Sequence, residues 1–292
     1  MTVLAMSTQF SVHQFFEGRR IALLTKHGKE SVMAPLLKEK LGMELEVVTG
    51  FDTDLLGTFS GEIERELDPL SAAKRKCELA LQFSDCDIAI ASEGSFGPHP
   101  HIPFASCDEE WVVIMDQKNN FLFIEREWSL ETNFSGRVVS TEAELMEFAQ
   151  KAQFPSHGLI LRKEQGKNSL VIKGANTPVL LKSHFHYLNE KWGKVFVETD
   201  MRAHCNPTRM NVIQRTTEKL IQKMLSACPR CKLPGFGVVS ASPGLPCSLC
   251  EAPTNSVLYL VKNCQFCNYS DKLYYPHNKR TEDPMFCDQC NP

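Results

Sequence analysis

Four CxxC pairs near the C-terminus constrain the fold of this chain more than any other feature. They are Cys228/Cys231, Cys247/Cys250, Cys264/Cys267 and Cys287/Cys290. A CxxC turn directs two sulfurs toward one ion, and two such turns complete a tetrahedral zinc site. The 292-residue chain is not a small secreted scaffold, so metal ligation is favoured over disulfides. We expect two structural Zn²⁺ ions, because closed four-thiolate sites leave no position for a reacting water.

The spacing leaves open which pairs share an ion. Fifteen residues separate the first pair from the second, and 19 separate the third from the fourth. Both gaps fit a four-cysteine site read in sequence order, so sequential pairing is preferred and cross-braced pairing is the alternative. Residues 226–292 contain few large apolar side chains and would fold mainly through metal ligation.

Composition is that of an ordinary globular protein, with 42% hydrophobic and 23% charged residues. The net charge of −3 gives no overall attraction for nucleic acid or an acidic membrane surface. No apolar run reaches 18 residues, and the first residues lack the basic start of a secretory leader. We therefore expect a cytoplasmic protein with no membrane partner.

Strand and helix patterns alternate over the first third of the chain. Strands at 19–25, 43–49 and 87–92 alternate with helices at 30–41 and from 68 onward. This order predicts an α/β fold with a mixed, centrally parallel sheet and flanking helices. Later segments predict a hairpin at 111–126, helices at 141–151 and 211–225, and strands at 158–162, 170–173 and 194–198. The expected domains are an arm at 1–17, an α/β domain at 18–225 and a zinc-ribbon-like module at 226–292.

Two regions contain candidate phosphate-binding residues. One is the basic loop that joins the first strand to the helix at 30–41, where free N–H groups and the helix dipole favour an anion. The other is the basic run in the helix that Asp68-Pro69 begins. The candidates are Lys26, Lys29, Lys74 and Arg75.

Candidate catalytic residues follow two of the predicted strands. Ligands of open α/β sheets bind beyond the carboxyl ends of strands, where the strand at 87–92 is followed by a carboxylate and two histidines. After the strand at 194–198, three unlike polar residues alternate, and an extended chain would place them on one face. A solvated strand end is the other interpretation of that second segment. The candidates are Glu93, His99, His101, Asp200, Arg202 and His204.

Several long strings resemble a known family. GTFSGEIERELDPLSAAKRKCELA, IASEGSFGPHP, DMRAHCNPTR and the terminal CxxC motifs are similar to an uncharacterised, mainly bacterial family defined only as a domain of unknown function. More distantly, residues 19–164 resemble the inosine triphosphate pyrophosphatase-like superfamily, which includes the Maf proteins and non-canonical purine nucleoside triphosphatases. The matching features are the Thr25-Lys26-His27-Gly28-Lys29 loop, the Ala-rich basic helix and the strand ending in Glu93-Gly94.

The second resemblance implies a metal-dependent nucleotide hydrolase. It implies a triphosphate on Lys26 and Lys29, and Mg²⁺ on Glu93 with a second carboxylate from the acidic stretch at 52–68. His99 or His101 would position the attacking water. The alternative is a zinc-ribbon adaptor that binds protein or RNA and has a non-catalytic α/β domain. A third hypothesis is an enzyme of another reaction type that uses the same carboxylate, histidine and arginine residues.

Nucleic acid remains an alternative partner of the zinc module. From Ile221 to Pro292 there are seven Lys and Arg against five Asp and Glu, which is a weaker basic character than nucleic-acid binders show. Four tyrosines in this region could stack on bases, although packing around zinc is the preferred role: Tyr259, Tyr269, Tyr274 and Tyr275.

Overall fold

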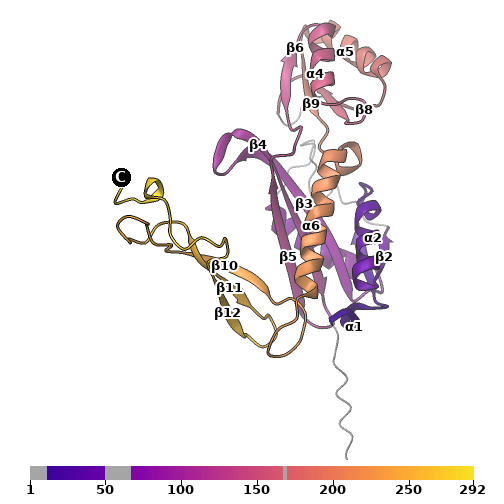
Figure 1. Ribbon diagram of the computed structural model, residues 1–292. Coiled ribbons are helices and arrows are strands. Elements are labelled where there is room, and N and C mark those ends of the chain that lie inside the picture. Colours follow the sequence, from indigo (N-terminus) through magenta and orange to yellow (C-terminus); the bar gives the residue numbers. More distant parts are fainter. Residues whose placement is uncertain (1–11, 50–66, 167–169) are drawn as a thin grey trace, which may run out of the picture. The chain divides into compact units, whose positions relative to one another are not determined.

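The computed structural model describes residues 12–49, 67–166 and 170–292, which form two compact units (Figure 1). The α/β unit is Gly18–Leu220, and the cysteine unit combines residues 12–17 with Ile221–Pro292. Five carboxylates of the predicted acidic stretch lie outside the described residues: Asp52, Asp54, Glu62, Glu64 and Glu66. In the described ranges, no helix has the length and apolar character needed to cross a membrane.

The α/β unit is built on a five-stranded mixed sheet. Its strands are β1 (Arg20–Leu24), β2 (Glu44–Val48), β3 (Ile88–His99), β4 (Ile102–Asp116) and β5 (Phe121–Ser129). Their order is β2-β1-β3-β4-β5; β1 is parallel to β2 and β3, and β4 is antiparallel to β3 and β5. The mixed α/β fold expected from the sequence is confirmed.

Helices lie against both faces of this sheet (Figure 1). α3 (Pro69–Gln82) begins at Asp68, whose side chain accepts a hydrogen bond from the Ser71 amide as an N-cap. Its buried stripe packs with Ala89, Ala91 and Val113 on one face. α6 (Pro207–Leu225) contacts β4 and β5 on the opposite face through its arginines. α2 (Glu30–Leu41) joins β1 to β2 and buries its apolar side.

A second, four-stranded sheet completes the α/β unit. It contains β6 (Gly136–Val139), β7 (Leu159–Arg162), β8 (Val171–Ala175) and β9 (Val195–Thr199) in the order β6-β9-β7-β8. α4 (Glu142–Lys151) and α5 (Pro178–Trp192) share its core. The sequence patterns missed β6 and α5, although α5 carries clear end signals in Thr177, Pro178 and the left-handed Gly193.

The central strand β3 is longer than predicted. It does not end at Ser92 but continues to His99, paired along its whole length with β4. β1 pairs with β3 only as far as Ile90, so the later part of β3 extends beyond the end of β1. Pro98 lies at a register irregularity between β3 and β4, where a strand can include proline. Glu93 therefore lies within a strand, beyond the carboxyl end of β1.

The cysteine unit contains a short helix and a three-stranded antiparallel sheet. The helix is α1 (Val12–Phe16), and the strands are β10 (Gly237–Pro243), β11 (Val257–Asn263) and β12 (Ser270–Tyr274) in the order β10-β11-β12. The helix lies in the segment at 1–17 that was expected to form an arm. Every residue of β12 is exposed, and every residue of β11 is half-buried, so this sheet has little apolar core.

Candidate functional site

Two four-cysteine groups in the cysteine unit can each hold a metal ion. One contains Cys228, Cys231, Cys264 and Cys267, and the other contains Cys247, Cys250, Cys287 and Cys290. Sulfur pairs from different CxxC turns lie 3.6 to 3.9 Å apart. A tetrahedron with metal–sulfur bonds of about 2.3 Å requires sulfur separations of about 3.8 Å. The four-thiol geometry therefore fits a tetrahedral ion such as zinc.

The pairing is cross-braced, so the preferred sequential order was wrong. The first and third CxxC turns lie at the end of the sheet where Gly237 pairs with Asn263. The second turn follows β10 and the fourth follows β12, at the opposite end. A seven-residue strand spans about 20 Å, which is far more than one ion can bridge. Gap length could not reveal this, because it ignores the antiparallel path of the chain.

Backbone amides support the charged form of the ligands. The amide of Leu249 donates to the Sγ of Cys247 at 3.4 Å, and the amide of Cys267 donates to the Sγ of Cys264 at 3.5 Å. The amides of Cys250 and Leu249 lower the pKa of the Cys247 thiol to about 7. Thiolates are the form that binds metal, so these turns are suited to ligation before any ion arrives.

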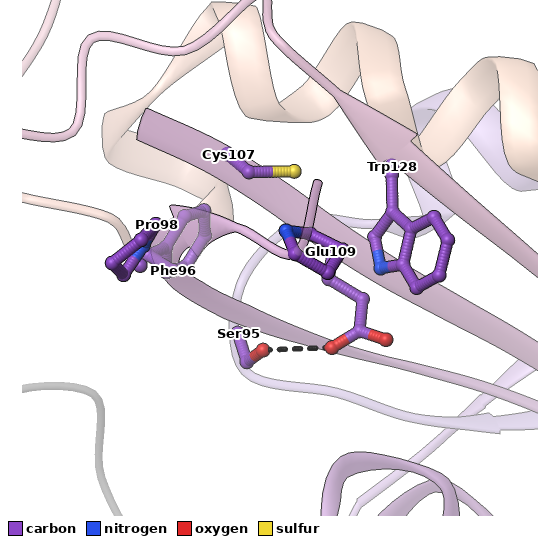
Figure 2. Close-up of a pocket in the computed structure, with 8 residues that line it drawn as sticks. Ser95, Phe96, Pro98, Cys107, Glu109 and Trp128 are labelled. Atoms are coloured by element: carbon purple, nitrogen blue, oxygen red, sulfur yellow. Dashed lines mark hydrogen bonds between the residues drawn. The ribbon is translucent and has the colours of Figure 1, made fainter. Parts of the chain in front are cut away.

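The tip of the β3–β4 hairpin holds the two predicted histidines. His99 and His101 lie edge-on to the indole of Trp128, with ring centroids 6.1 Å apart in both cases. Next to them is a pocket that Trp128, Glu109 and Ser95 help to line (Figure 2). His99 is six residues beyond Glu93 along an extended strand, a separation of about 20 Å. The structure therefore does not bring these histidines to Glu93.

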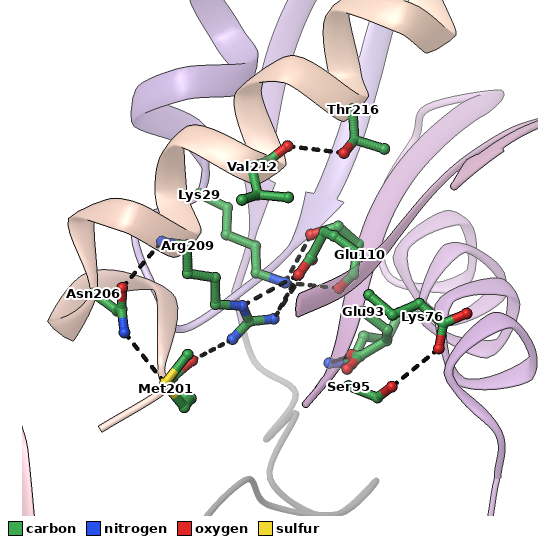
Figure 3. A network of polar contacts seen from close by, with 12 residues as sticks. Lys29, Lys76, Glu93, Ser95, Glu110, Met201, Asn206, Arg209, Val212 and Thr216 are labelled. Carbon is green, nitrogen blue, oxygen red and sulfur yellow. Dashed lines mark hydrogen bonds and ion pairs between the residues drawn. The ribbon is translucent and has the colours of Figure 1, made fainter. Parts of the chain in front are cut away.

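Charged side chains gather around the part of β3 that extends beyond the end of β1 (Figure 3). Lys29, at the start of α2, donates to the carbonyl and the hydroxyl of Ser92 at 2.7 and 2.8 Å. It is 5% exposed, and burial together with the nearby Arg209 charge lowers the pKa of its amine to about 7. Burial thus favours the neutral form of the Lys29 amine, and a bound anion would favour the protonated form.

Lys76 reaches the same strand from α3. Its amine is hydrogen-bonded and ion-paired with the Glu93 carboxylate, which is 4% exposed. Within the basic run it is Lys76 that meets Glu93, whereas Arg75 pairs with Glu78 at 2.9 Å on the exposed side. Lys29 and Lys76 therefore approach the Ser92–Glu93 segment from opposite faces of the sheet.

A buried ion pair lies on the α6 side of this segment. Arg209 and Glu110 are both fully buried, with nitrogen–oxygen distances of 3.2 Å. The guanidinium also donates to the carbonyl of Met201 at 2.6 Å. A Cβ on Gly94 would lie 2.8 Å from Nη2 of Arg209, so only glycine fits here. Removing one partner of such a buried pair typically costs about 3–5 kcal/mol.

Asp108 lies close to this ion pair and differs from the other charged residues in its hydrogen bonding. It is fully buried, and neither carboxylate oxygen has a hydrogen-bond partner among the described residues. Burial, followed by the Glu110 charge, raises the pKa of Asp108 to about 8. Asp108 is therefore mostly protonated at neutral pH, and it adds little negative charge beside Glu110.

Comparison with known protein families gives one match for this chain. A family model described as a domain of unknown function, DUF6671, matches residues 76–292. The chain belongs to the DUF6671 family. No curated protein and no solved structure matches the chain. None of these comparisons supports the resemblance to the inosine triphosphate pyrophosphatase-like superfamily, which stays an expectation from the sequence.

The DUF6671 region contains most of the charged cluster and both cysteine groups. Lys76, Glu93, Glu110 and Arg209 lie within residues 76–292, and Lys29 precedes them. The sequence patterns proposed Lys29 and Glu93 but missed Lys76 and Arg209. Helical spacing could have found both, because Lys76 is three residues from Ala73, and Arg209 is three and four residues from Val212 and Ile213.

The predicted DMRAH segment of the DUF6671 region is not extended. Ala203–Cys205 forms a 3₁₀ turn, so Asp200, Arg202 and His204 do not share the face expected from alternation. Asp200 accepts two hydrogen bonds from Arg202 side-chain nitrogens, at 2.9 and 2.5 Å. Burial alone would raise the pKa of Asp200, but Arg202 outweighs it and holds that pKa below its usual value.

His204 instead meets the phosphate loop of the sequence prediction. Its Nδ1 lies 3.1 Å from Nδ1 of His27, and the two rings stack with centroids 5.0 Å apart. Burial and the Lys29 charge lower the pKa of His27 to about 3, so this imidazole is neutral at physiological pH. The contact links the loop after β1 to the segment before α6, next to Lys29. The other candidate of this loop, Lys26, is exposed.

Proposed function

We propose that this DUF6671 chain hydrolyses nucleoside triphosphates at the part of β3 that extends beyond the end of β1. The observation that carries the proposal is the approach of Lys29 to Ser92 and of Lys76 to the adjacent Glu93, from two separate helices. Their meeting point lies beyond the carboxyl end of the parallel strand β1, where ligands of α/β sheets bind. The distant superfamily resemblance suggests the triphosphate as the substrate class.

The two lysines suit the binding of a phosphate chain. Lys76 is the more accessible cation, with a side chain 16% exposed, and Glu93 holds it in place. Lys29 gains its full charge when an anion arrives, because its pKa rises from a value near neutrality. Both amines would stabilise negative charge on the phosphate oxygens during attack by water. His27, near Lys29, is neutral, but a pKa of about 3 makes it a weak base, so it is suited to hydrogen bonding rather than to proton abstraction from that water.

The described residues do not by themselves compose a magnesium site. In the described ranges, the groups of three or more potential metal ligands are the two four-cysteine groups. Glu93 supplies one carboxylate and is ion-paired with Lys76. The second carboxylate expected from the acidic stretch lies outside the described residues, so no step of the proposal passes through Mg²⁺.

Release of phosphate and pyrophosphate tests the proposal. Purified metal-loaded chain is incubated with canonical and modified nucleoside triphosphates, with and without Mg²⁺, beside Glu93→Gln and the control Glu78→Gln. Glu78 lies on the exposed side of α3 with Arg75, so its variant tests the substitution type alone. We expect turnover that Glu93→Gln reduces by about 100-fold or more and that Glu78→Gln leaves unchanged. No turnover of any nucleotide by the wild-type chain would reject the proposal.

We infer that both four-cysteine groups hold structural zinc. The support is the all-sulfur donor set, the near-tetrahedral spacing and the amide-stabilised thiol of Cys247. All eight ligands come from the protein, so the ions would organise the cysteine unit rather than take part in hydrolysis.

A second candidate function, nucleic-acid binding, has one specific observation in its favour. Tyr259, Tyr274 and Tyr275 form a row of rings with centroids 5.0 and 6.2 Å apart. Lys272 lies 4.4 Å from the Tyr259 ring and Arg280 lies 5.5 Å from the Tyr275 ring. Tyr274 is exposed and the other two rings are half-buried. Aromatic rings flanked by cations are typical of single-strand binding surfaces. Two zinc–tetrathiolate groups would each add a charge of −2, so the module as a whole is not basic.

Fluorescence anisotropy with labelled single-stranded RNA and DNA tests this second candidate. Tyr274→Ala is compared with Tyr187→Ala, because Tyr187 on α5 is similarly exposed and also lies near a lysine. Binding that only Tyr274→Ala weakens supports the surface. Binding that is absent at low salt, or equal in both variants, contradicts it.

A further inference from the structure

The pocket at the β3–β4 hairpin contains none of the residues assigned to the phosphate chain, and its lining suggests a ligand. Its volume is about 330 Å³, near the lower end of the range for small-molecule sites. Trp128, Pro98 and Pro100 contribute apolar walls, and Ser95, Cys107 and Glu109 contribute polar atoms (Figure 2). An aromatic side chain combined with few polar groups suits a flat ring with a polar edge.

The charges of this pocket favour a neutral ligand. Arg126 lies 4.1 Å from the Trp128 ring and 4.8 Å from the Trp111 ring, and its Nη1 is 3.4 Å from Oε1 of Glu109. The guanidinium therefore already compensates the carboxylate. A cationic ligand would be repelled by Arg126, and an anionic ligand by Glu109. A neutral ring would meet neither repulsion.

Glu109 determines which ring edge the pocket can recognise. The Ser95 hydroxyl donates to Oε2 of Glu109 at 3.1 Å and so fixes the carboxylate, whose side chain is 25% exposed. An ionised carboxylate only accepts hydrogen bonds, and its two oxygens offer about four lone-pair sites. It therefore selects a ring with adjacent N–H donors. Among nucleobases, guanine presents N1–H beside an amino group, hypoxanthine presents N1–H alone, and adenine places an acceptor at N1.

The pocket lies on the same face of the sheet as Glu93. Glu93 pairs with Trp111 and Ser95 pairs with Glu109, and residues two apart on a strand share a face about 7 Å apart. A nucleotide with its phosphates on Lys76 would thus have its base near Glu109. We propose that this pocket binds the base of the substrate and prefers guanine; the assignment of a nucleotide rests on the proposed function.

Direct binding of nucleosides to the full metal-loaded chain tests the pocket without any hydrolysis. Isothermal titration calorimetry with guanosine, inosine, adenosine and uridine should give the tightest binding for guanosine. Glu109→Gln should weaken guanosine by about tenfold or more, because the amide places a donor against a donor, and should leave adenosine unchanged. The matched control Glu44→Gln, on β2 in an exposed ion pair with Lys38, should change nothing.

A second pair of variants guards against misfolding. Trp128→Phe keeps an aromatic wall and should retain guanosine binding, whereas Trp128→Ala should lose it. Absence of saturable nucleoside binding, equal binding in Glu109→Gln and wild type, or preference for a cationic amine such as choline would each overturn the inference.

These outcomes separate the pocket from the proposed function. Guanosine binding that depends on Glu109, in a chain that hydrolyses no nucleotide, would uphold the pocket and reject the hydrolase. Hydrolysis that depends on Glu93, with no effect of Glu109→Gln on nucleoside binding, would do the reverse.

Discussion

At the scale of single residues, Asp108 shows why burial matters more than residue type. Its pattern in the sequence is that of any acidic strand residue, and only the packing of β4 beneath α6 removes it from water. The same holds for Lys29, which the sequence proposed as a charged phosphate ligand but whose burial lowers the pKa of its amine to about 7. The sequence thus identified Lys29 as a candidate. The pKa of its amine, however, depends on residues that are distant in the sequence, such as Arg209.

Replacing Asp108 with asparagine should stabilise the chain increasingly as pH rises. The folded pKa of about 8 lies above the ordinary value of 3.8, so the folded state binds more protons between these values. Stability of the wild type therefore falls with rising pH across this window, by up to about 1.4 kcal/mol per pH unit, and Asp108→Asn lacks this loss. Urea unfolding of both proteins at pH 6, 7 and 8 measures the difference. A pH-independent difference would contradict the buried, protonated state.

At the scale of elements, sequence periodicity predicted a helix or strand correctly where the signals lie within that segment. It failed where the extent of the element depends on pairing with another strand. The start of α3 at Asp68 was predicted correctly because the N-cap residue, the proline after it and the apolar spacing all lie within or next to the helix. The continuation of β3 to His99 was not, because Gly94, Gly97 and Pro98 suggest an end unless pairing with β4 is known. The same limit applies to cysteine pairing, which depends on which end of the sheet each turn occupies.

Paired cysteine substitutions should reveal the cross-brace. Cys231→Ser with Cys264→Ser removes two ligands from one group and should leave about one zinc per chain. Cys231→Ser with Cys250→Ser removes one ligand from each group and should weaken both sites. Zinc content after dialysis against a weak chelator, measured by mass spectrometry of the metal, compares the two variants. Retention of one full site in the second variant but not in the first would contradict the cross-brace.

At the scale of the whole molecule, the two units differ in what holds them together. The α/β unit has continuous apolar clusters on its sheets, whereas the cysteine cluster around Phe236 is small and β12 is exposed throughout. The sequence anticipated this difference from composition, because residues 226–292 contain few large apolar side chains. It could not place α1, whose five residues carry too little periodicity.

Chelation of zinc should therefore unfold the cysteine unit alone. Backbone amide resonances of residues 226–292 should collapse toward unfolded shifts in a strong chelator, while those of the two α/β sheets stay dispersed. Restoring zinc should restore the spectrum. Loss of dispersion throughout the chain would show that the α/β unit also depends on the metal, and no change at all would show that the cysteine groups are not structural.

The central claim is that Lys29 and Lys76 form a phosphate site with Glu93, and Lys76 tests it most directly. Steady-state hydrolysis of the best triphosphate by Lys76→Ala is compared with that by Arg75→Ala, one residue away on the same helix but paired with Glu78 on the exposed side. The account predicts a loss of about 100-fold or more in kcat/KM for Lys76→Ala and less than about twofold for Arg75→Ala. Equal activity of the two variants, or a larger loss in Arg75→Ala, would contradict it.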